Sequence, residues 1–220
     1  MADWRFIFEK WILGKHWSPP FEPKVKQLIR SMKGDVFIDI GSNTGIYSRL
    51  AQKRFKQVYS FDPNPEYHAI QFAISDRRGV QPFYYGNGIG SADSLVRNPH
   101  ILGIDWKNET DSIQVETLTF DDLRLDADLV KIDVEGAEFK VLEGMNLYLP
   151  KTLIIELHDE RRENELVEKM NGKGYSTSRI DSSHFLFTLP LSLQYHKGQQ
   201  PEDDAEHVWE KVAGNTDAEP

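Results

Sequence analysis

Short apolar runs separated by polar segments fill the middle of the chain, and four of them end in an acidic residue. These runs lie at 36–39, 57–62, 129–133 and 153–156. Such runs are typical of buried parallel strands, whose carboxyl ends carry ligand-binding groups. Apolar segments at 175–180 and 185–189 indicate two antiparallel strands. The pattern predicts an α/β sandwich of three layers with a mostly parallel sheet and antiparallel strands at one edge.

The first run opens into a turn that contains Gly41 and Gly45 and precedes a helical pattern. Glycine permits a sharp strand-to-helix turn, and the start of a helix leaves main-chain N–H groups for a ligand. The spacing places Asn43 where a dinucleotide-binding turn has a glycine for the diphosphate. The turn therefore favours a nucleoside cofactor without a diphosphate.

S-adenosylmethionine fits this turn, because its carboxylate accepts N–H bonds and its ammonium group can donate to a nearby acid. We predict cofactor contacts for five residues of this segment: Asp39, Gly41, Asn43, Thr44 and Gly45. The alternative is a turn whose glycines serve chain geometry alone.

A second acid follows the next run at a distance suited to a ribose contact. Asp62 ends that run seventeen residues after Gly45. An acid about 20 residues beyond a glycine-rich turn can accept hydrogen bonds from both ribose hydroxyls. We predict this role for Asp62; the alternative is a turn that Asp62 begins with Asn64 and its neighbouring prolines.

A shorter apolar run at 70–74 ends in Ser75 and Asp76. If this run lies beside the second strand, its polar end meets the adenine ring, and Asp76 accepts a hydrogen bond from the exocyclic amine. The alternative is a turn into the following strand.

The fourth strand and the residues after it combine charge and glycine in the same manner. Lys131 and Asp133 alternate onto one face, and Asp133 and Glu135 lie at the carboxyl edge of the sheet. We predict that Asp133 contributes to the cofactor and catalytic site and that Lys131 and Glu135 bind substrate.

Taken in order, four sequence blocks resemble the FkbM family, a branch of the Rossmann-like methyltransferases. They are FIDIGSNTGIYS at 37–48, FDPNP at 61–65, AISD at 73–76 and LVKIDVEGAE at 129–138. The resemblance extends over about residues 34–190. It implies a Rossmann-like methyltransferase that uses S-adenosylmethionine to methylate a hydroxyl group of a small metabolite, sugar or glycan.

One departure from the family pattern concerns the crossover between the second and third strands. Only residues 66–69 separate Pro65 from the apolar run that begins at Ile70. A parallel crossover usually needs a dozen or more residues. We therefore expect distorted strand pairing and an open wall at the adenine pocket.

A hydroxyl acceptor needs a base or a metal to remove its proton as it attacks the methyl group. Glu156 and His158 follow the fifth strand, next to Asp133. We predict that His158 is the base and that Glu156 orients it, with Asp133 beside them. The alternative is a divalent cation bound by Asp133, Glu156 and His158. The residues also fit a purely structural pairing at the strand ends.

Composition and charge limit the remaining choices. The chain has 220 residues, no cysteine and a formal charge of −9, so it lacks a general attraction for nucleic acid. This charge agrees with the small-molecule or glycan acceptor that the resemblance implies, and the oligomeric state stays open. Without a signal sequence or a long apolar run, the cytoplasm is the default location. The alternative functions are an RNA methyltransferase and a non-catalytic nucleoside-binding or interaction domain.

The sequence predicts three segments: an aromatic-rich helical segment at 1–24, a methyltransferase domain at 25–190 and an acidic, flexible tail at 191–220. Trp4, Phe8 and Trp11 share one helical face, which should pack against the core or the substrate cleft. A polar, glycine-rich loop at 87–98 is expected near the cleft.

Overall fold

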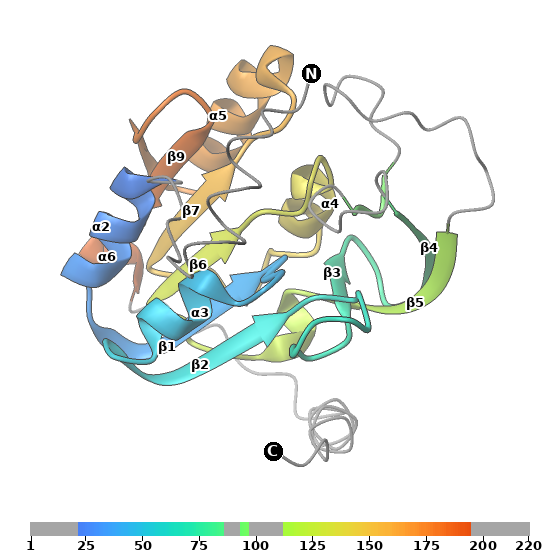
Figure 1. Ribbon diagram of the computed structural model, residues 1–220. Helices are drawn as coiled ribbons and strands as arrows, with labels where there is room; N and C mark the ends of the chain where they lie inside the picture. The colour runs from blue at the N-terminus through green and yellow to red at the C-terminus, as the bar shows by residue number, and fades with distance from the viewer. Residues whose placement is uncertain (1–21, 86–92, 97–111, 195–220) are drawn as a thin grey trace, which may run out of the picture.

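The protein is represented by a computed structural model that describes residues 22–85, 93–96 and 112–194 (Figure 1). The first half contains α2 (Pro23–Ser31), β1 (Gly34–Ile40), α3 (Ile46–Ala51), β2 (Phe55–Phe61), β3 (Ala73–Ser75), β4 (Gly79–Tyr84) and β5 (Ser112–Thr119). The second half contains η1 (Asp121–Leu123), β6 (Leu129–Ile132), α4 (Glu138–Glu143), β7 (Thr152–Glu156), η2 (Glu160–Arg162), α5 (Glu163–Gly172), β8 (Ser176–Arg179), β9 (His184–Thr188) and α6 (Leu191–Gln194). The predicted aromatic face around Trp4 and most of the acidic tail lie outside the described residues.

The main sheet has six strands in the order β2-β1-β6-β7-β9-β8. β1 pairs in parallel with β2 and β6, and β6 pairs in parallel with β7. β9 runs antiparallel to both β7 and β8. The structure thus confirms the predicted α/β fold, with a mostly parallel sheet and antiparallel strands at one edge.

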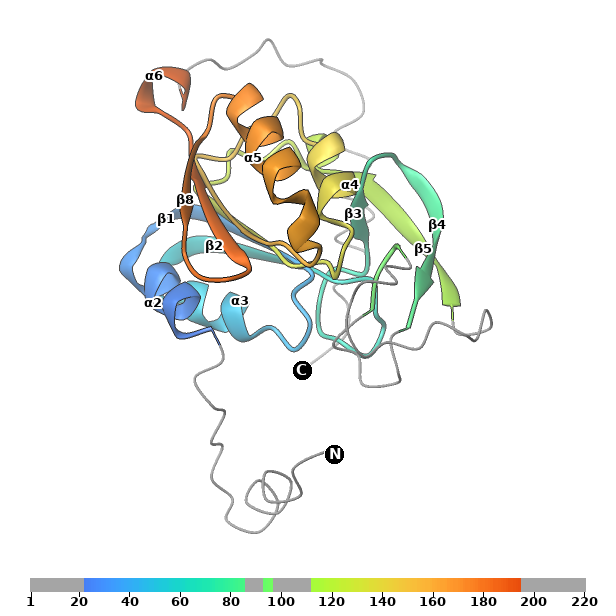
Figure 2. The same ribbon diagram turned by 90° about the horizontal axis from the view of Figure 1, so that it is seen from above.

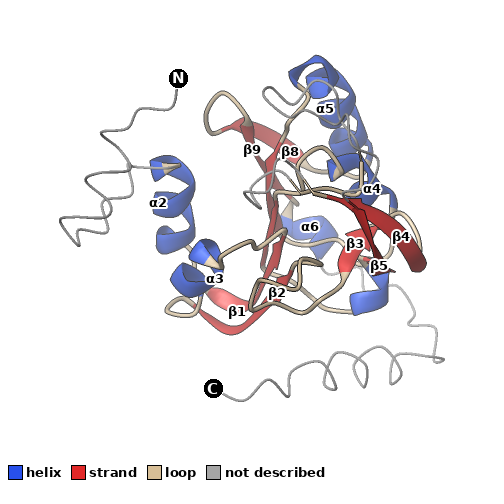
Figure 3. Cartoon of the chain, turned by 45° about the vertical axis from the view of Figure 1, so that its right-hand side comes forward, coloured by secondary structure: helices blue, strands red, loops and turns tan. Residues whose placement is uncertain are grey.

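Helices cover both faces of this sheet and produce three layers (Figure 3). On one face, Val25 and Ile29 of α2 pack with Phe37 of β1 in a single apolar cluster. On the other face, Leu166 of α5 shares a larger core with Ile38 of β1. Phe37 and Ile38 belong to different cores because successive side chains of a strand point to opposite faces. Figure 2 shows the two helical layers from above.

A second sheet of three strands, in the order β3-β5-β4, stands beside the main sheet (Figure 1). The chain makes one parallel bridge between Phe61 and Ile70, and then pairs as β3 with β5. No helix lies between β2 and β3, all of whose linking residues are described. The short crossover therefore moves the third strand out of the main sheet, as its length suggested. Among the described helices, none has the length and apolarity needed to cross a membrane.

The turn after β1 depends on a close approach between two strand ends. Gly41 has a φ of 77°, a left-handed value that favours glycine. A Cβ atom at this position would overlap the carbonyl oxygen of Asp133, which follows β6. Gly41 is therefore required both by its backbone angle and by the contact that brings the ends of β1 and β6 together.

We predict that Gly41→Ala lowers the free energy of unfolding by more than about 3 kcal/mol, since it combines left-handed strain with a backbone overlap. Urea denaturation monitored by circular dichroism measures the change. Gly172→Ala is the matched control, because its Cβ meets nothing within 4 Å. It should be neutral or stabilise the fold by up to about 1 kcal/mol. Equal unfolding midpoints for the two variants would contradict this account.

Candidate active site

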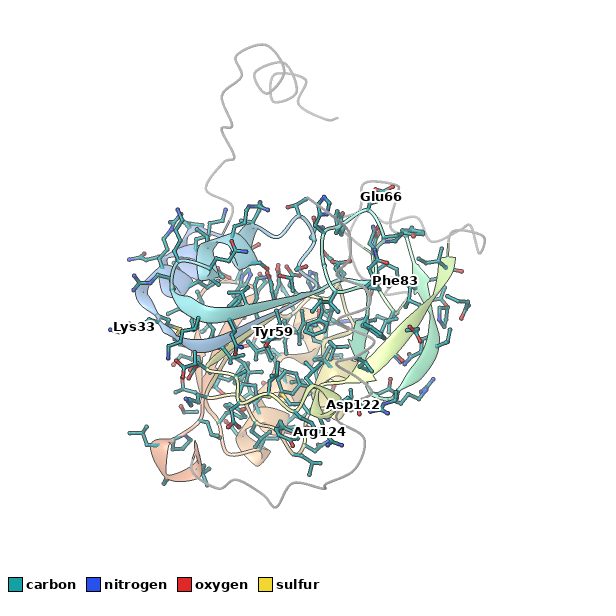
Figure 4. The ribbon with its side chains drawn as sticks, turned by 90° about the horizontal axis from the view of Figure 1, so that it is seen from below. Lys33, Tyr59, Glu66, Phe83, Asp122 and Arg124 are labelled. Atoms are coloured by element: carbon teal, nitrogen blue, oxygen red, sulfur yellow. The ribbon has the colours of Figure 1, made fainter. Side chains whose placement is uncertain are left out.

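A cavity of about 580 Å³, part of it open to solvent, lies where the main sheet faces the second sheet. Its polar wall contains Gly41 and Asn43 after β1, Asp62 after β2, and Asp133 and Glu135 after β6. Its apolar wall contains Phe61, Phe72, Ile74, Phe83, Leu95 and Val134; Figure 4 labels Phe83. Its mixed lining, largely apolar with a few polar groups, is that of a small-molecule site.

Asp62 lies in this cavity at the end of β2, the position that the sequence predicted. One carboxylate oxygen accepts the main-chain N–H of Asn43 at 2.8 Å, and the other accepts that of Asn64 at 3.0 Å. Burial raises the pKa of Asp62 to about 6, although these two hydrogen bonds act to lower it. The fixed, buried carboxylate links the glycine turn to the end of β2.

The amides of the glycine turn are already used inside the protein. Gly41 and Ser42 donate to the carbonyl of Phe61 at 2.9 and 3.1 Å, and Gly45 donates to Ser42 at 2.8 Å. The amide of Thr44 donates to the side chain of Asn43 at 2.6 Å. In this conformation the turn offers no free amide to a ligand carboxylate. The sequence located the turn, but the tertiary structure assigns its N–H groups to other partners.

Three other residues predicted to bind the cofactor lie outside the cavity wall. Asp39 is fully buried, and its carboxylate accepts the hydroxyl of Ser48 at 2.5 Å. Burial raises the pKa of Asp39, an effect that Lys131 and Ser48 oppose. Thr44 is exposed on the outer side of the turn. Gly45 has a φ of 71° and also stays outside the lining, so its role here is to permit the turn.

Ser75 and Asp76 are also displaced from the cavity, because β3 has joined the second sheet. Asp76 accepts the Ser75 hydroxyl at 2.8 Å and pairs with Lys140 at 3.3 Å. Burial acts to raise the pKa of Asp76, but these partners hold it at about 2. The adenine contact of these residues stays a prediction without support from the cavity lining.

Lys131 is buried beneath the site instead of facing a substrate. Its ammonium group lies 2.7 Å from the carboxylate of Asp133 and 4.4 Å from the centre of the Tyr47 ring. Burial lowers the pKa of Lys131, but the negative charges of Asp133, Asp39 and Glu22 outweigh this effect. The pKa of Lys131 is therefore raised overall. Although burial raises the pKa of Asp133, Lys131 and His158 bring it below its usual range. Lys131 thus compensates buried carboxylates.

His158 lies among carboxylates at the carboxyl ends of β6 and β7. Its Nδ1 is 2.8 Å from Glu138, and its Nε2 is 3.0 Å from Glu135 and 3.7 Å from Asp133. Glu156, which we expected to orient the ring, is 4.0 Å from Nε2. The orienting carboxylate is therefore Glu138, which is itself buried and accepts the amide of Gly136 at 2.8 Å.

These carboxylates determine the charge of His158. Burial lowers its pKa, but Glu135 and Glu138 raise it to about 11, so the ring is an imidazolium at neutral pH. Burial also raises the pKa of Glu135, while its hydrogen bond to His158 lowers it in part. His158 therefore already carries a proton, and Glu135 is the carboxylate that contacts it and also lines the cavity.

Among the residues that the structure describes, two groups of side chains have the composition of a metal site. In the first, Asp133, Glu135 and His158 bring ligand atoms within 4.8 Å of one another. Glu135 takes the place that we expected for Glu156. Glu156 instead belongs to a second group with Glu22 and His184, whose ligand atoms lie within the same distance.

Sequence reasoning missed four residues of this region: Glu22, Asp93, Glu138 and His184. Asp93 lines the cavity and accepts the side-chain amide of Asn64 at 2.8 Å. The signal for Glu138 was an acid on the apolar side of a short helix. Glu22 and His184 carried no usable signal, because they are far from the motifs in sequence.

Comparison with known proteins places this site in a family. The model of the methyltransferase FkbM domain matches residues 39–182. The 2-O-methyltransferase NoeI of Sinorhizobium fredii is 34% identical over 161 residues, which cover 60% of this chain and 65% of that protein. The hexuronic acid methyltransferase AglP of Haloferax volcanii is 33% identical over 135 residues, 56% of each chain. This chain therefore spans less than two thirds of either relative.

Similarity to solved structures is looser. The Mtq2–Trm112 complex of E. cuniculi aligns with a TM-score of 0.44 and 11% identity, covering 76% of this chain and 92% of that chain. The precorrin-6y C5,15-methyltransferase of Geobacter metallireducens aligns with a TM-score of 0.43 and 12% identity, covering 77% and 90%. The family match extends over most of the described sheet and includes the turn after β1, Asp62 and the cluster around His158. This chain belongs to the FkbM methyltransferase domain family.

Proposed function

We propose that this chain transfers a methyl group from S-adenosylmethionine to a hydroxyl group of a neutral sugar or glycan. The observation that carries the proposal is one cavity that contains both Asp62 and the acidic residues Asp133 and Glu135. A nucleoside site and a proton-accepting group thus share one space. The family match supports methyl transfer, and the printed names of the two relatives support transfer to oxygen for the first and to a sugar acid for the second. The restriction to a neutral acceptor rests on the charge of this site alone.

The lining of the cavity fits the proposed methyl donor. Asp62 would accept the ribose hydroxyls, and Phe72, Ile74 and Phe83 would surround the adenine ring. Asp133 or Glu135 would accept the ammonium group of the amino-acid part. When bound, S-adenosylmethionine supplies an electrophilic methyl group. The short crossover leaves the second sheet, in place of a crossover helix, as the adenine wall.

The cluster around His158 supplies the proton acceptor. As the acceptor oxygen forms its bond to the methyl carbon, the carbon–sulfur bond breaks and its electron pair stays on sulfur. The hydroxyl proton moves to the carboxylate of Glu135. The imidazolium of His158, held by Glu138, keeps this carboxylate in position at 3.0 Å. This assignment makes Glu135 the base and His158 its positioning residue.

The charge of the region favours an acceptor without negative charge. Around the strand ends, six carboxylates (Glu22, Asp133, Glu135, Glu138, Glu156 and Asp181) stand with one ammonium group, that of Lys131, and the two imidazole rings of His158 and His184. The excess negative charge repels phosphate and carboxylate groups. Neutral sugar hydroxyls can donate hydrogen bonds to the same oxygens.

For the cofactor, we predict that Asp62→Asn weakens S-adenosylmethionine binding by at least about tenfold, because a charged hydrogen-bond acceptor is lost. In the unchanged protein, affinity should fall as the pH drops from 7 to 5. The pKa of Asp62 is about 6, so its carboxylate becomes protonated over this range and accepts hydroxyl donors less well. Isothermal titration calorimetry measures both effects.

The exposed Asp35, which pairs with Lys56 at the other end of β1, provides the matched control. Asp35→Asn should leave affinity unchanged, and Asp62→Asn should lose the pH dependence. If Asp62→Asn binds the cofactor normally at pH 7, Asp62 has no ribose role.

For the chemical step, we predict that Glu135→Gln lowers kcat by about 100-fold or more, the usual contribution of a general base. The rate of the unchanged enzyme should fall at acidic pH, as Glu135 becomes protonated. His158→Gln should lower kcat and move this acidic limb to higher pH, because the hydrogen bond that lowers the pKa of Glu135 is removed. The pH dependence of kcat measures these changes.

The exposed His68 lies outside the cavity lining, and His68→Gln is the control with unchanged rates. An acidic limb that persists in Glu135→Gln would remove Glu135 from the base role. Normal kcat and pH dependence in His158→Gln would remove His158 from the mechanism.

For the acceptor, we predict that neutral glycosides are methylated at least about tenfold faster than glucuronides of the same aglycone. The reason is that the acidic region repels the carboxylate of the glucuronide. Mass spectrometry after incubation with S-adenosylmethionine identifies the products. Preferential methylation of glucuronides would contradict the charge argument. Cofactor binding without methylation of any glycan would contradict the proposed acceptor class.

A further inference from the structure

A group of three side chains outside the cavity lining joins three separate parts of the fold. Glu22 directly precedes α2, Glu156 ends β7 and His184 begins β9. Nε2 of His184 lies 3.1 Å from a carboxylate oxygen of Glu22 and 3.3 Å from one of Glu156. The side chains of Glu22 and His184 are only 7% and 3% exposed. Two carboxylates and one imidazole are thus held together in a mostly dry environment.

The orientation of these groups does not match simple hydrogen bonding. Within the described part of the chain, Nε2 of His184 and Oε1 of Glu22 are buried without a partner in hydrogen-bonding geometry. Nε2 is within ion-pair distance of both glutamates, but it makes no geometrically sound hydrogen bond to either. A buried polar atom without a good hydrogen bond is costly. A cation among the three side chains would give Nε2 and the carboxylates a common partner.

The surrounding contacts are those of a metal-binding histidine. Nδ1 of His184 lies 2.8 Å from the carboxylate of Asp181, which fixes the ring and directs Nε2 toward the two glutamates. Metal-ligating histidines usually bond their second nitrogen to a carboxylate or carbonyl in this way. The hydroxyl of Tyr47 donates to Glu22 and orients that carboxylate as well.

We infer that Glu22, Glu156 and His184 bind a divalent transition-metal ion such as Zn²⁺ or Mn²⁺. With ligand bonds of about 2.1 Å, neighbouring ligand atoms stand about 3.0 to 3.4 Å apart. The observed separations of 3.1 and 3.3 Å agree with this spacing. One imidazole and two carboxylates suit these ions. Glu156, whose side chain is 19% exposed, leaves access for solvent ligands.

This ion would join the start of α2 to β7 and β9, and it goes beyond the proposed methyl transfer. None of its three ligands lines the cofactor cavity. The site is also distinct from the group of Asp133, Glu135 and His158. Metal binding can therefore be measured without any methyl donor or acceptor.

The test uses the full chain, dialysed against EDTA and then against metal-free buffer. Calorimetric titration with MnCl₂ or ZnCl₂ and elemental analysis after gel filtration give affinity and stoichiometry. Glu22→Gln and His184→Gln should each lose one ion per chain or weaken its binding at least tenfold. His158→Gln, the control in the neighbouring group, should retain that ion. Thermal unfolding with Mn²⁺ should show a raised Tm in the unchanged protein and a smaller rise in Glu22→Gln.

Three results would overturn the inference. One is the absence of Mn²⁺ and Zn²⁺ binding up to millimolar concentration, which would leave His184 as an imidazolium shared by carboxylates. Another is an ion lost in His158→Gln and retained in Glu22→Gln. The third result needs no variant. In crystals soaked in Mn²⁺, anomalous density would appear only away from Nε2 of His184. Density bonded to Nε2 and both glutamates would support the site even if a variant failed to fold.

Discussion

The carboxyl edge of the sheet depends on one interaction, that of the buried ammonium group of Lys131 with the carboxylates around it. The ammonium group lies 2.7 Å from Asp133 and acts electrostatically on Asp39 and Glu22 as well. Carboxylates removed from water need such a partner, since an uncompensated buried charge costs several kcal/mol. By compensating several acids at once, Lys131 allows acidic side chains to be buried at the ends of β1 and β6.

The surplus of carboxylates near Lys131 also determines the charge of His158. His158 is surrounded so closely by Glu135 and Glu138 that its ring remains protonated. A histidine at this position in sequence suggests a base, but its neighbours decide its charge. The mechanism that we propose therefore gives the proton-accepting role to Glu135, whose pKa is raised by burial and which lines the cavity. The acidic surroundings also favour a neutral, hydroxyl-rich acceptor.

Much of the fold and part of the site could be predicted from local sequence. Period and run length indicated the strands, and an acid at the end of β2 placed Asp62 in the cavity wall. Asp133 and Glu135 were placed correctly at the edge of the sheet for the same reason. The short link before Ile70 also indicated that the third strand would not pair normally, and it joins the second sheet.

Contacts between distant segments could not be inferred in this way, because they depend on how the layers pack. The sequence by itself determined the strands of the main sheet, the glycine turn and the acids at the strand ends, since each is a property of neighbouring residues. Only the tertiary structure decided that the turn amides are already bonded, that Glu138 orients His158, and that Glu22 meets His184. The last two pairings join residues 20 and 162 positions apart, and such proximity is not encoded by any local pattern.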